Sequence, residues 1–172
     1  SAVARKYENR DDPYAELPMS TERKYLHGQV VLVGYGHVGE RIVQALMEQD
    51  IPFVVAEQNR ELVQDLRKRN INAVSGDATE PSVLIQAHIT DAAMLVIAIP
   101  DPLNVRQMID TARTLNPEIE IVLRTRNEDE TALLRRDKVG TVFFSEEELA
   151  KSMTHHILQR FDTKLENDII KH

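Results

Sequence analysis

The stretch that decides the fold is Val30-Val31-Leu32-Val33-Gly34-Tyr35-Gly36-His37-Val38-Gly39. Its first four residues form an apolar run typical of a buried strand, and the residues after the turn favour a helix. The turn has the G-x-G-x-x-G pattern, in which the first glycine permits a tight turn and the second permits close approach to a diphosphate. The third glycine permits close packing of the helix on the strand. Backbone N–H groups at the helix start would then face phosphate charge.

An acidic residue stands at the distance that this motif requires. Glu57 closes a second apolar run, roughly 20 residues after the glycine turn. A carboxylate there can accept hydrogen bonds from both hydroxyls of an adenosine ribose, and it repels a 2′-phosphate. Arg60 leaves two interpretations open, because it could neutralise a 2′-phosphate or be a solvated side chain of the first helical turn. We favour a phosphate-binding turn over a glycine-rich turn without a ligand.

The composition of the 172-residue chain is that of one globular domain. Apolar residues make up 42%, and the formal net charge of −7 argues against nucleic acid as the main partner. There is no cysteine, so disulfides and thiol catalysis are excluded. The longest apolar stretch, Ala92 to Pro100, is too short to span a bilayer, and no signal peptide opens the chain. Because the chain does not begin with methionine, we expect it to be a piece of a longer protein.

Strand and helix patterns alternate from Gln29 onward, which predicts a parallel sheet covered by helices on both faces. The short apolar runs expected as strands are Gln29–Val33, Phe53–Glu57, Ala73–Ser75, Met94–Ile99, Ile119–Leu123 and Thr141–Phe144. Their order predicts an α/β fold with a Rossmann-like, doubly wound parallel six-stranded sheet of strand order 3-2-1-4-5-6. We expect this domain to span residues 28–161, after a polar linker or arm over residues 1–27.

Helix starts and the last helix can also be placed. The capping residues are Asn59, Asp101 before Pro102, Asn127 with Glu130, and Ser145 with Glu148. An apolar stripe at helical spacing follows, formed by Leu149, Met153, Ile157 and Phe161. This C-terminal amphipathic helix could fold back on its own sheet or dock on a second copy, and we favour a homodimer through the helix and the sheet edge. Residues 162–172 turn polar and are expected to fray.

The carboxyl ends of parallel strands meet at one edge of a sheet, so the ligand would lie in the crevice outside strands 1 and 4. The residues expected at this crevice are Gly34, Tyr35, Gly36, His37, Val38, Gly39, Glu57, Gln58, Asp77, Ala78, Ile99, Pro100 and Arg124. Asp77 has two open interpretations, contact with an adenine edge or capping of the helix that begins near Pro81. Arg124 and Arg126 point to one face of a strand, where one could reach the phosphates or form a surface ion pair.

No Ser/His/Asp or His/Glu set gathers at these strand ends, and no metal-ligand spacing occurs. His155 and His156 are adjacent, so on a helix they point about 100° apart and cannot grip one metal as an i, i+4 pair does. We therefore expect a binding domain that is not an enzyme and holds no metal.

Three motifs together carry a family resemblance: the glycine turn, Gly76-Asp77-Ala78-Thr79 and Leu123-Arg124-Thr125-Arg126. Over residues 28 to 161 the chain resembles the RCK domain, also called KTN or TrkA-N. This is the nucleotide-binding regulatory domain of bacterial potassium transport systems. The chain looks most like the YbaL-like branch of Kef-type cation/proton antiporters, and its residues 11–20 are similar to the linker of that branch.

The resemblance implies a homodimeric regulatory domain on the cytoplasmic side of the inner membrane. It would bind an adenine nucleotide, AMP or NAD(H) above all, and gate a monovalent cation/proton antiporter on the same full-length chain. Two alternatives stay open, a fragment of an NAD-dependent oxidoreductase and a free-standing nucleotide-binding subunit that docks on a membrane transporter. The motif alone does not choose among adenine nucleotides, because all of them share the adenosine and phosphate that it contacts.

Residue roles follow from the resemblance by position. The three glycines of the turn and Arg124 would face the phosphates, Glu57 the ribose, and Asp77 with Ala78 the adenine. Relatives often carry arginine where this chain has His37. Histidine gives weaker charge assistance to a phosphate, and we expect nucleotide affinity to fall as pH rises from about 6 to 8.

Overall fold

The computed structural model describes residues 12–99 and 104–170, with side chains as far as Asp162. Its strands form one six-stranded parallel sheet in the order β3-β2-β1-β4-β5-β6, which confirms the predicted fold class and strand order. The strands are β1 (Val30–Val33), β2 (Phe53–Glu57), β3 (Ala73–Ser75), β4 (Met94–Ile97), β5 (Glu120–Thr125) and β6 (Thr141–Phe144). Sequence patterns therefore located every strand to within two residues.

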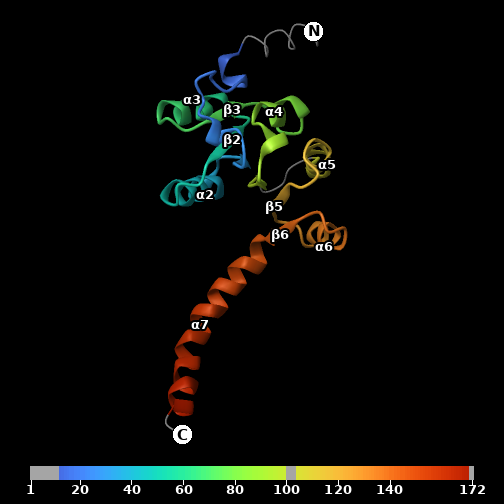
Figure 1. Cartoon of the computed structure of the whole chain (residues 1–172). Coiled ribbons are helices and arrows are strands. Elements are labelled where there is room, and N and C mark those ends of the chain that lie inside the picture. Colours follow the sequence, from blue (N-terminus) through green and yellow to red (C-terminus); the bar gives the residue numbers. More distant parts are fainter. Residues whose placement is uncertain (1–11, 100–103, 171–172) are drawn as a thin grey trace.

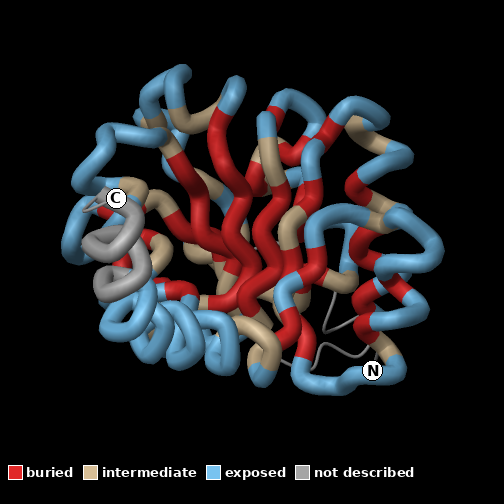
Figure 2. The backbone as a smooth tube through the Cα atoms, turned by 90° about the horizontal axis from the view of Figure 1, so that it is seen from below, coloured by how far each residue is buried: buried red, intermediate tan, exposed pale blue. Residues whose placement is uncertain are grey.

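Burial on both faces explains why the central strands are continuous apolar runs. Val31, Leu32 and Val33 are almost completely buried, and the strands lie in the middle of the molecule with exposed helices outside them (Figure 2). Val33 pairs with Ala56 of β2 and with Ile97 of β4. The carboxyl ends of β1, β2 and β4 therefore meet at one edge of the sheet.

The helices lie on both faces of the sheet (Figure 1), and the buried apolar residues fall into two clusters, one under each layer. The first two helices cover one face and the next three cover the other. They are α2 (His37–Glu48) and α3 (Arg60–Lys68), then α4 (Pro81–Gln86), α5 (Val105–Leu115) and α6 (Glu128–Arg136), with the short turn η3 (Ile89–Asp91) before β4.

Two of the predicted helix caps are confirmed. Asn59 accepts hydrogen bonds from two backbone N–H groups in the first turn of α3, and Asn127 accepts one from the N–H of Glu130 at 2.9 Å. Each bond satisfies an N–H group that has no partner within its helix. The cap predicted at Asp101 and Pro102 lies outside the described residues.

Helix α7 (Ser145–Ile170) differs from the prediction at both ends. Ser145 is not a residue that caps the helix from outside, because β6 runs directly into α7 and Ser145 is its first residue. Its hydroxyl donates to the carbonyl oxygen of Thr125 at 3.0 Å and so ties the helix to β5. The helix continues to Ile170, although fraying was expected from residue 162, because no glycine or proline follows Gly140 in the sequence. It projects away from the sheet (Figure 1).

The described part of the N-terminal segment lies against the sheet and is not an extended linker. Residues 12–25, which we call the strap, contain the short turns η1 (Pro13–Ala15) and η2 (Arg23–Tyr25), and η1 contacts β3 and α3. Tyr14 packs on the apolar cluster under α2 and α3, whereas Leu17 and Tyr25 pack on the other cluster. The strap thus crosses the edge strand β3. Its three apolar side chains follow no helical or strand period, so sequence periodicity does not reveal their burial.

Candidate functional site

The glycine turn, the end of β2 and the loop after β3 lie side by side at the carboxyl edge of the sheet. The N–H of Tyr35 donates to Oε1 of Glu57 at 3.0 Å, and the N–H of Gly76 donates to the carbonyl oxygen of Glu57 at 3.1 Å. Ile99 lies against Gly34, since a Cβ on this glycine would stand 2.8 Å from Ile99 Cγ1. The structure therefore brings together predicted residues from four separate segments of the chain.

Arg124 lies at the same edge, on the neighbouring strand β5. The residue before it, Leu123, pairs with Ile97 of β4, and the Arg124 side chain is half-buried. It is one strand farther from the glycine turn than Ile99 is. Pro100, also predicted for the site, lies outside the described residues.

The three glycines of the turn have different surroundings. Gly34 has a φ of +96°, which side chains rarely adopt, and a Cβ there would also press on Ile99. A Cβ on Gly39 would collide with the carbonyl oxygen of Gly34. Gly36, by contrast, has a φ of −97°, and among residues 12–99 and 104–170, its two chain neighbours aside, no heavy atom lies within 4 Å of the place a Cβ would take. The packing of the described residues therefore requires glycine at positions 34 and 39 and does not require it at position 36.

The space in front of Gly36 faces the positive end of a helix. α2 begins at His37, and Gly36 caps it without a side chain that could accept from its first N–H groups. Such N–H groups have no acceptor within the helix, and the helix dipole adds a partial positive charge to them. His37 and Val38 are exposed beside this end. The outer side of the turn can accept a phosphate with its backbone.

Glu57 is held in place by the backbone around it. Besides the N–H of Tyr35, its carboxylate accepts the N–H of Asn59, so it joins the glycine turn to the start of α3. The side chain is only partly buried. A carboxylate has about four acceptor sites, so two bonds to the backbone leave capacity for the hydroxyls of a ribose.

Asp77, in the loop after β3, forms hydrogen bonds within its own loop. Its Oδ1 accepts from the N–H of Thr79 at 2.9 Å and from the Thr79 hydroxyl at 2.8 Å, which fixes the turn that leads into α4. The residue that precedes α4 as its cap is Glu80, so Asp77 shapes the loop and does not cap the helix itself. Ala78 is buried in the core.

A hollow of about 690 Å³ opens at the ends of β2 and β3. Its volume is within the usual range of small-molecule sites. It contains two predicted residues, Gln58 and Asp77, and adds residues that sequence reasoning did not place in the site. The charged residues that line it are Asp12, Glu16, Arg60, Asp77 and Glu80.

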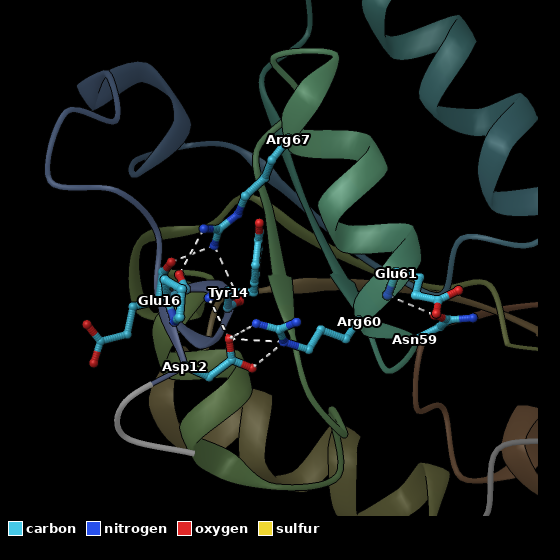
Figure 3. Close-up of polar contacts among 8 residues, drawn as sticks. Asp12, Tyr14, Glu16, Asn59, Arg60, Glu61 and Arg67 are labelled. Carbon is cyan, nitrogen blue, oxygen red and sulfur yellow. Dashed lines mark hydrogen bonds and ion pairs between the residues drawn. The ribbon is translucent and has the colours of Figure 1, made fainter. Parts of the chain in front are cut away.

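Arg60 is engaged by the strap and is not merely solvated. Its Nε donates to both carboxylate oxygens of Asp12 at 3.2 and 3.1 Å, and its Nη2 donates to Oδ1 at 3.1 Å (Figure 3). The hydrogen bonds from Arg60 lower the pKa of Asp12 below its usual value, so the carboxylate is charged at neutral pH. Sequence reasoning treated Asp12 as part of a linker, yet Asp12-Pro13 has the pattern of a capping residue before a first-turn proline.

Two further observations concern only the described residues. Within residues 12–99 and 104–170, no group of three or more His, Cys, Asp or Glu side chains is arranged to hold a metal ion. Over the same residues, no helix combines the length and the apolar character needed to cross a membrane.

The family model of the TrkA-N domain matches residues 30–145, from the first strand to the start of α7. This match covers more than half of the chain, and the chain therefore belongs to the TrkA-N family. The resemblance to RCK domains that the sequence motifs indicated is confirmed.

Two relatives extend this result. YbaL of Escherichia coli (strain K12), which carries the name "Putative cation/proton antiporter YbaL", is 37% identical over 123 residues, which are 72% of this chain and 22% of YbaL. KefB of Alkalimonas amylolytica, which carries the name "Putative K(+) efflux antiporter KefB", is 28% identical over 137 residues, which are 80% of this chain and 21% of KefB. The chain thus spans about a fifth of the length of these relatives. It is a TrkA-N domain of the kind found in YbaL and Kef-type antiporters.

Solved structures share the fold. The TrkA-N domain of the E. coli inner membrane protein YbaL superposes with a TM-score of 0.71 at 35% identity, covering 75% of this chain and 96% of that domain. The GsuK channel bound to NAD gives a TM-score of 0.62 at 22% identity, covering 83% of this chain and 25% of GsuK. The AMP-bound C-terminal domain of Kef from Shewanella denitrificans gives 0.65 at 22% identity, covering 77% of this chain and 80% of that domain.

Proposed function

We propose that this chain is a regulatory domain that binds an adenine nucleotide of the AMP or NAD(H) type at the turn Gly34–Gly39. The observation that carries the proposal is the open surrounding of Gly36. The described residues leave room for a side chain at this position, and we infer that the glycine serves something outside the chain. A phosphate group that must approach the backbone closely meets that need. That GsuK and the Kef domain have been solved with NAD and AMP supports this ligand class.

The parts of the nucleotide can be assigned to the residues at the sheet edge. Its phosphate lies over Gly36 and the N–H groups at the start of α2, with the His37 imidazole and the Arg124 guanidinium nearby. The ribose hydroxyls donate to Glu57. The adenine lies between the loop at Asp77 and the segment at Ile99, and meets the backbone of Ala78.

The nucleotide acts as a signal in this proposal and not as a reactant. Binding one arrangement of the domain more tightly than another shifts the balance between them, and a coupling of about 1–3 kcal/mol suffices. We propose that this shift gates a monovalent cation/proton antiporter on the same longer chain, at the cytoplasmic side of the inner membrane. The supporting observations are that YbaL is an inner membrane protein and that this chain matches only 22% of it.

A panel of adenine nucleotides tests the binding directly. A ligand that binds the folded state alone raises the melting temperature, by an amount that grows with its concentration above Kd. We expect AMP or NAD(H) to raise it, and guanosine 5′-monophosphate, which carries the same phosphate and ribose, to raise it less. If no adenine nucleotide raises it at millimolar concentration, the proposal is wrong.

We also propose that a second copy of the chain covers the apolar stripe of α7. Leu149, Met153, Ile157 and Phe161 are each more than half exposed, and Phe143 on β6, two residues before α7 begins, is 41% exposed. Light scattering should show a dimer, and Ile157→Asp should make it monomeric. The control is His155→Asp, which adds the same charge on the opposite side of the helix and should leave the dimer intact. A wild-type monomer would contradict this assignment.

A further inference from the structure

The strap is attached to the edge of the sheet mainly by one arginine of α3. Arg67 donates from Nε to the carbonyl oxygen of Ala73 on β3 at 2.9 Å. Its other nitrogens donate to carbonyl oxygens of the strap, those of Pro13 at 2.9 Å, Tyr14 at 3.3 Å and Glu16 at 2.5 Å (Figure 3). A charged donor shared among four carbonyl groups holds two segments together more firmly than a pair of exposed side chains does.

Asp12 extends this attachment to the rim of the hollow. Its carboxylate receives Nε and Nη2 of Arg60 and the N–H of Tyr14 at 3.0 Å. The Tyr14 ring lies 4.6 Å from the guanidinium carbon of Arg60 and 5.0 Å from that of Arg67. The Arg60 guanidinium is therefore held in one place, turned toward the strap by its hydrogen bonds and by the aromatic ring.

The charges around the hollow disfavour an anion. Among its described lining residues, Arg60 is the one cation, and the carboxylates of Asp12, Glu16, Asp77 and Glu80 surround it. Because Asp12 neutralises that cation, the wall presents an excess of negative charge.

This wall adjoins the place assigned to the ribose. Gln58, which follows Glu57 directly, and Arg60, at the start of α3, both line the hollow. In the proposed binding mode, we infer that a 2′-substituent on a ribose bonded to Glu57 lies near the start of α3, where Arg60 is found. In dinucleotide-binding folds an arginine near this position accommodates a 2′-phosphate. Arg60 is placed for that role but is engaged by Asp12.

We propose that Asp12 is a specificity-determining residue of the nucleotide site: by holding Arg60 it excludes adenine nucleotides that carry a 2′-phosphate. The inference rests on the proposed function, since it requires a nucleotide at Glu57. Asp12 lies in the strap, outside residues 30–145 that match the TrkA-N model. The inference therefore assigns part of the nucleotide selectivity to the strap.

The variant Asp12→Asn tests this inference with little change of shape. The amide oxygen can still accept from the N–H of Tyr14, while the charge that holds Arg60 is removed. The strap remains docked, because the bonds of Arg67 and the packing of Leu17 and Tyr25 do not involve Asp12.

The measurement is calorimetric titration with adenosine 5′-monophosphate and with adenosine 2′,5′-bisphosphate, expressed as the ratio of their Kd values. In the wild type, we expect the bisphosphate to bind at least about tenfold more weakly. In Asp12→Asn, the Kd of the bisphosphate divided by the Kd of the monophosphate should fall by about tenfold, which is the effect of one charge-assisted hydrogen bond. Adding Arg60→Ala to that variant should restore the wild-type ratio, because the freed guanidinium is then absent.

Two controls separate this effect from a general loss of negative charge. Glu16→Gln removes a lining carboxylate that does not bond to Arg60, and should change the ratio by less than about threefold. Arg60→Ala alone should also leave the ratio within about threefold, because Arg60 is already engaged in the wild type.

Several outcomes would overturn the inference. They are an unchanged ratio in Asp12→Asn, equal wild-type affinity for the two ligands, and a much weaker bisphosphate affinity in Arg60→Ala alone. The last two outcomes are measured without a variant of Asp12, so the inference can still be tested if Asp12→Asn does not fold. If the wild type binds no adenine nucleotide at all, the proposed function fails; if it binds AMP but Asp12→Asn leaves the ratio unchanged, only this inference fails.

Discussion

The glycine turn has an inner side that the chain fills and an outer side that it leaves open. On the inner side, Gly34 and Gly39 are enclosed so tightly that a methyl group would meet Ile99 or the backbone. On the outer side, no residue in the described part of the chain comes within 4 Å of a Cβ position on Gly36, apart from its two chain neighbours, and His37 and Val38 are exposed. One sequence motif thus combines glycines needed for the fold with a glycine that the fold does not need. Only the latter indicates a ligand.

The largest effect should come from the inner side. Gly39→Ala forces the backbone of α2 away from Gly34 and should lower the free energy of unfolding by about 2–3 kcal/mol, as other overpacked sites do. The matched control is Gly36→Ala, the same chemical change three positions earlier, which should alter stability by no more than about 0.5 kcal/mol. Urea unfolding measures both. Equal losses in the two variants would remove the distinction between the two sides.

The second-largest effect is expected from Glu57, which accepts the N–H of Tyr35 in the glycine turn. Glu57→Ala should weaken every adenosine ligand by about 1–3 kcal/mol, because the ribose hydroxyls lose their acceptor. Calorimetry on AMP measures the change. Glu61→Ala, which removes an exposed carboxylate from the first turn of α3, is the control for net charge and should leave affinity almost unchanged. If AMP binds Glu57→Ala as tightly as wild type, Glu57 does not contact the ribose.

The smallest effect is expected where a charge is added on the open side of the glycine turn. His37→Arg places a permanent cation at the start of α2 and should strengthen AMP binding by about 0.5–1 kcal/mol. Because His37 is exposed, the melting temperature without ligand should not change. Calorimetry at low and high salt measures the gain, which should shrink as salt screens it. A loss of affinity would mean that the phosphate does not pass this residue.

Much of the fold was predictable because its signals are local. Apolar runs located the strands, and Asn59 and Asn127 marked helix starts with side chains that bond to the next turn. The strap was not predictable in this way. Arg67 reaches carbonyl groups more than 50 positions away in the chain, and such contacts leave no periodic pattern. Ser145 has the spacing of a cap, but the direct passage from β6 into α7 gives its hydroxyl another partner.

The candidate site was predictable to a similar extent. The glycine turn and Glu57 follow from a motif whose spacing is set by the strand–helix–strand unit. Whether Gly36 is open depends on how neighbouring loops pack, which the motif does not contain. The burial of Ala78 and the engagement of Arg60 by Asp12 likewise depend on tertiary contacts.

Calorimetric titration of AMP and NAD into wild type and into Gly36→Ala tests the central claim most directly. We expect that the wild type binds at least one of these nucleotides and that Gly36→Ala, with unchanged stability, binds it at least about tenfold more weakly. Equal affinity in the two proteins would show that nothing approaches the turn at Gly36, and would contradict the account.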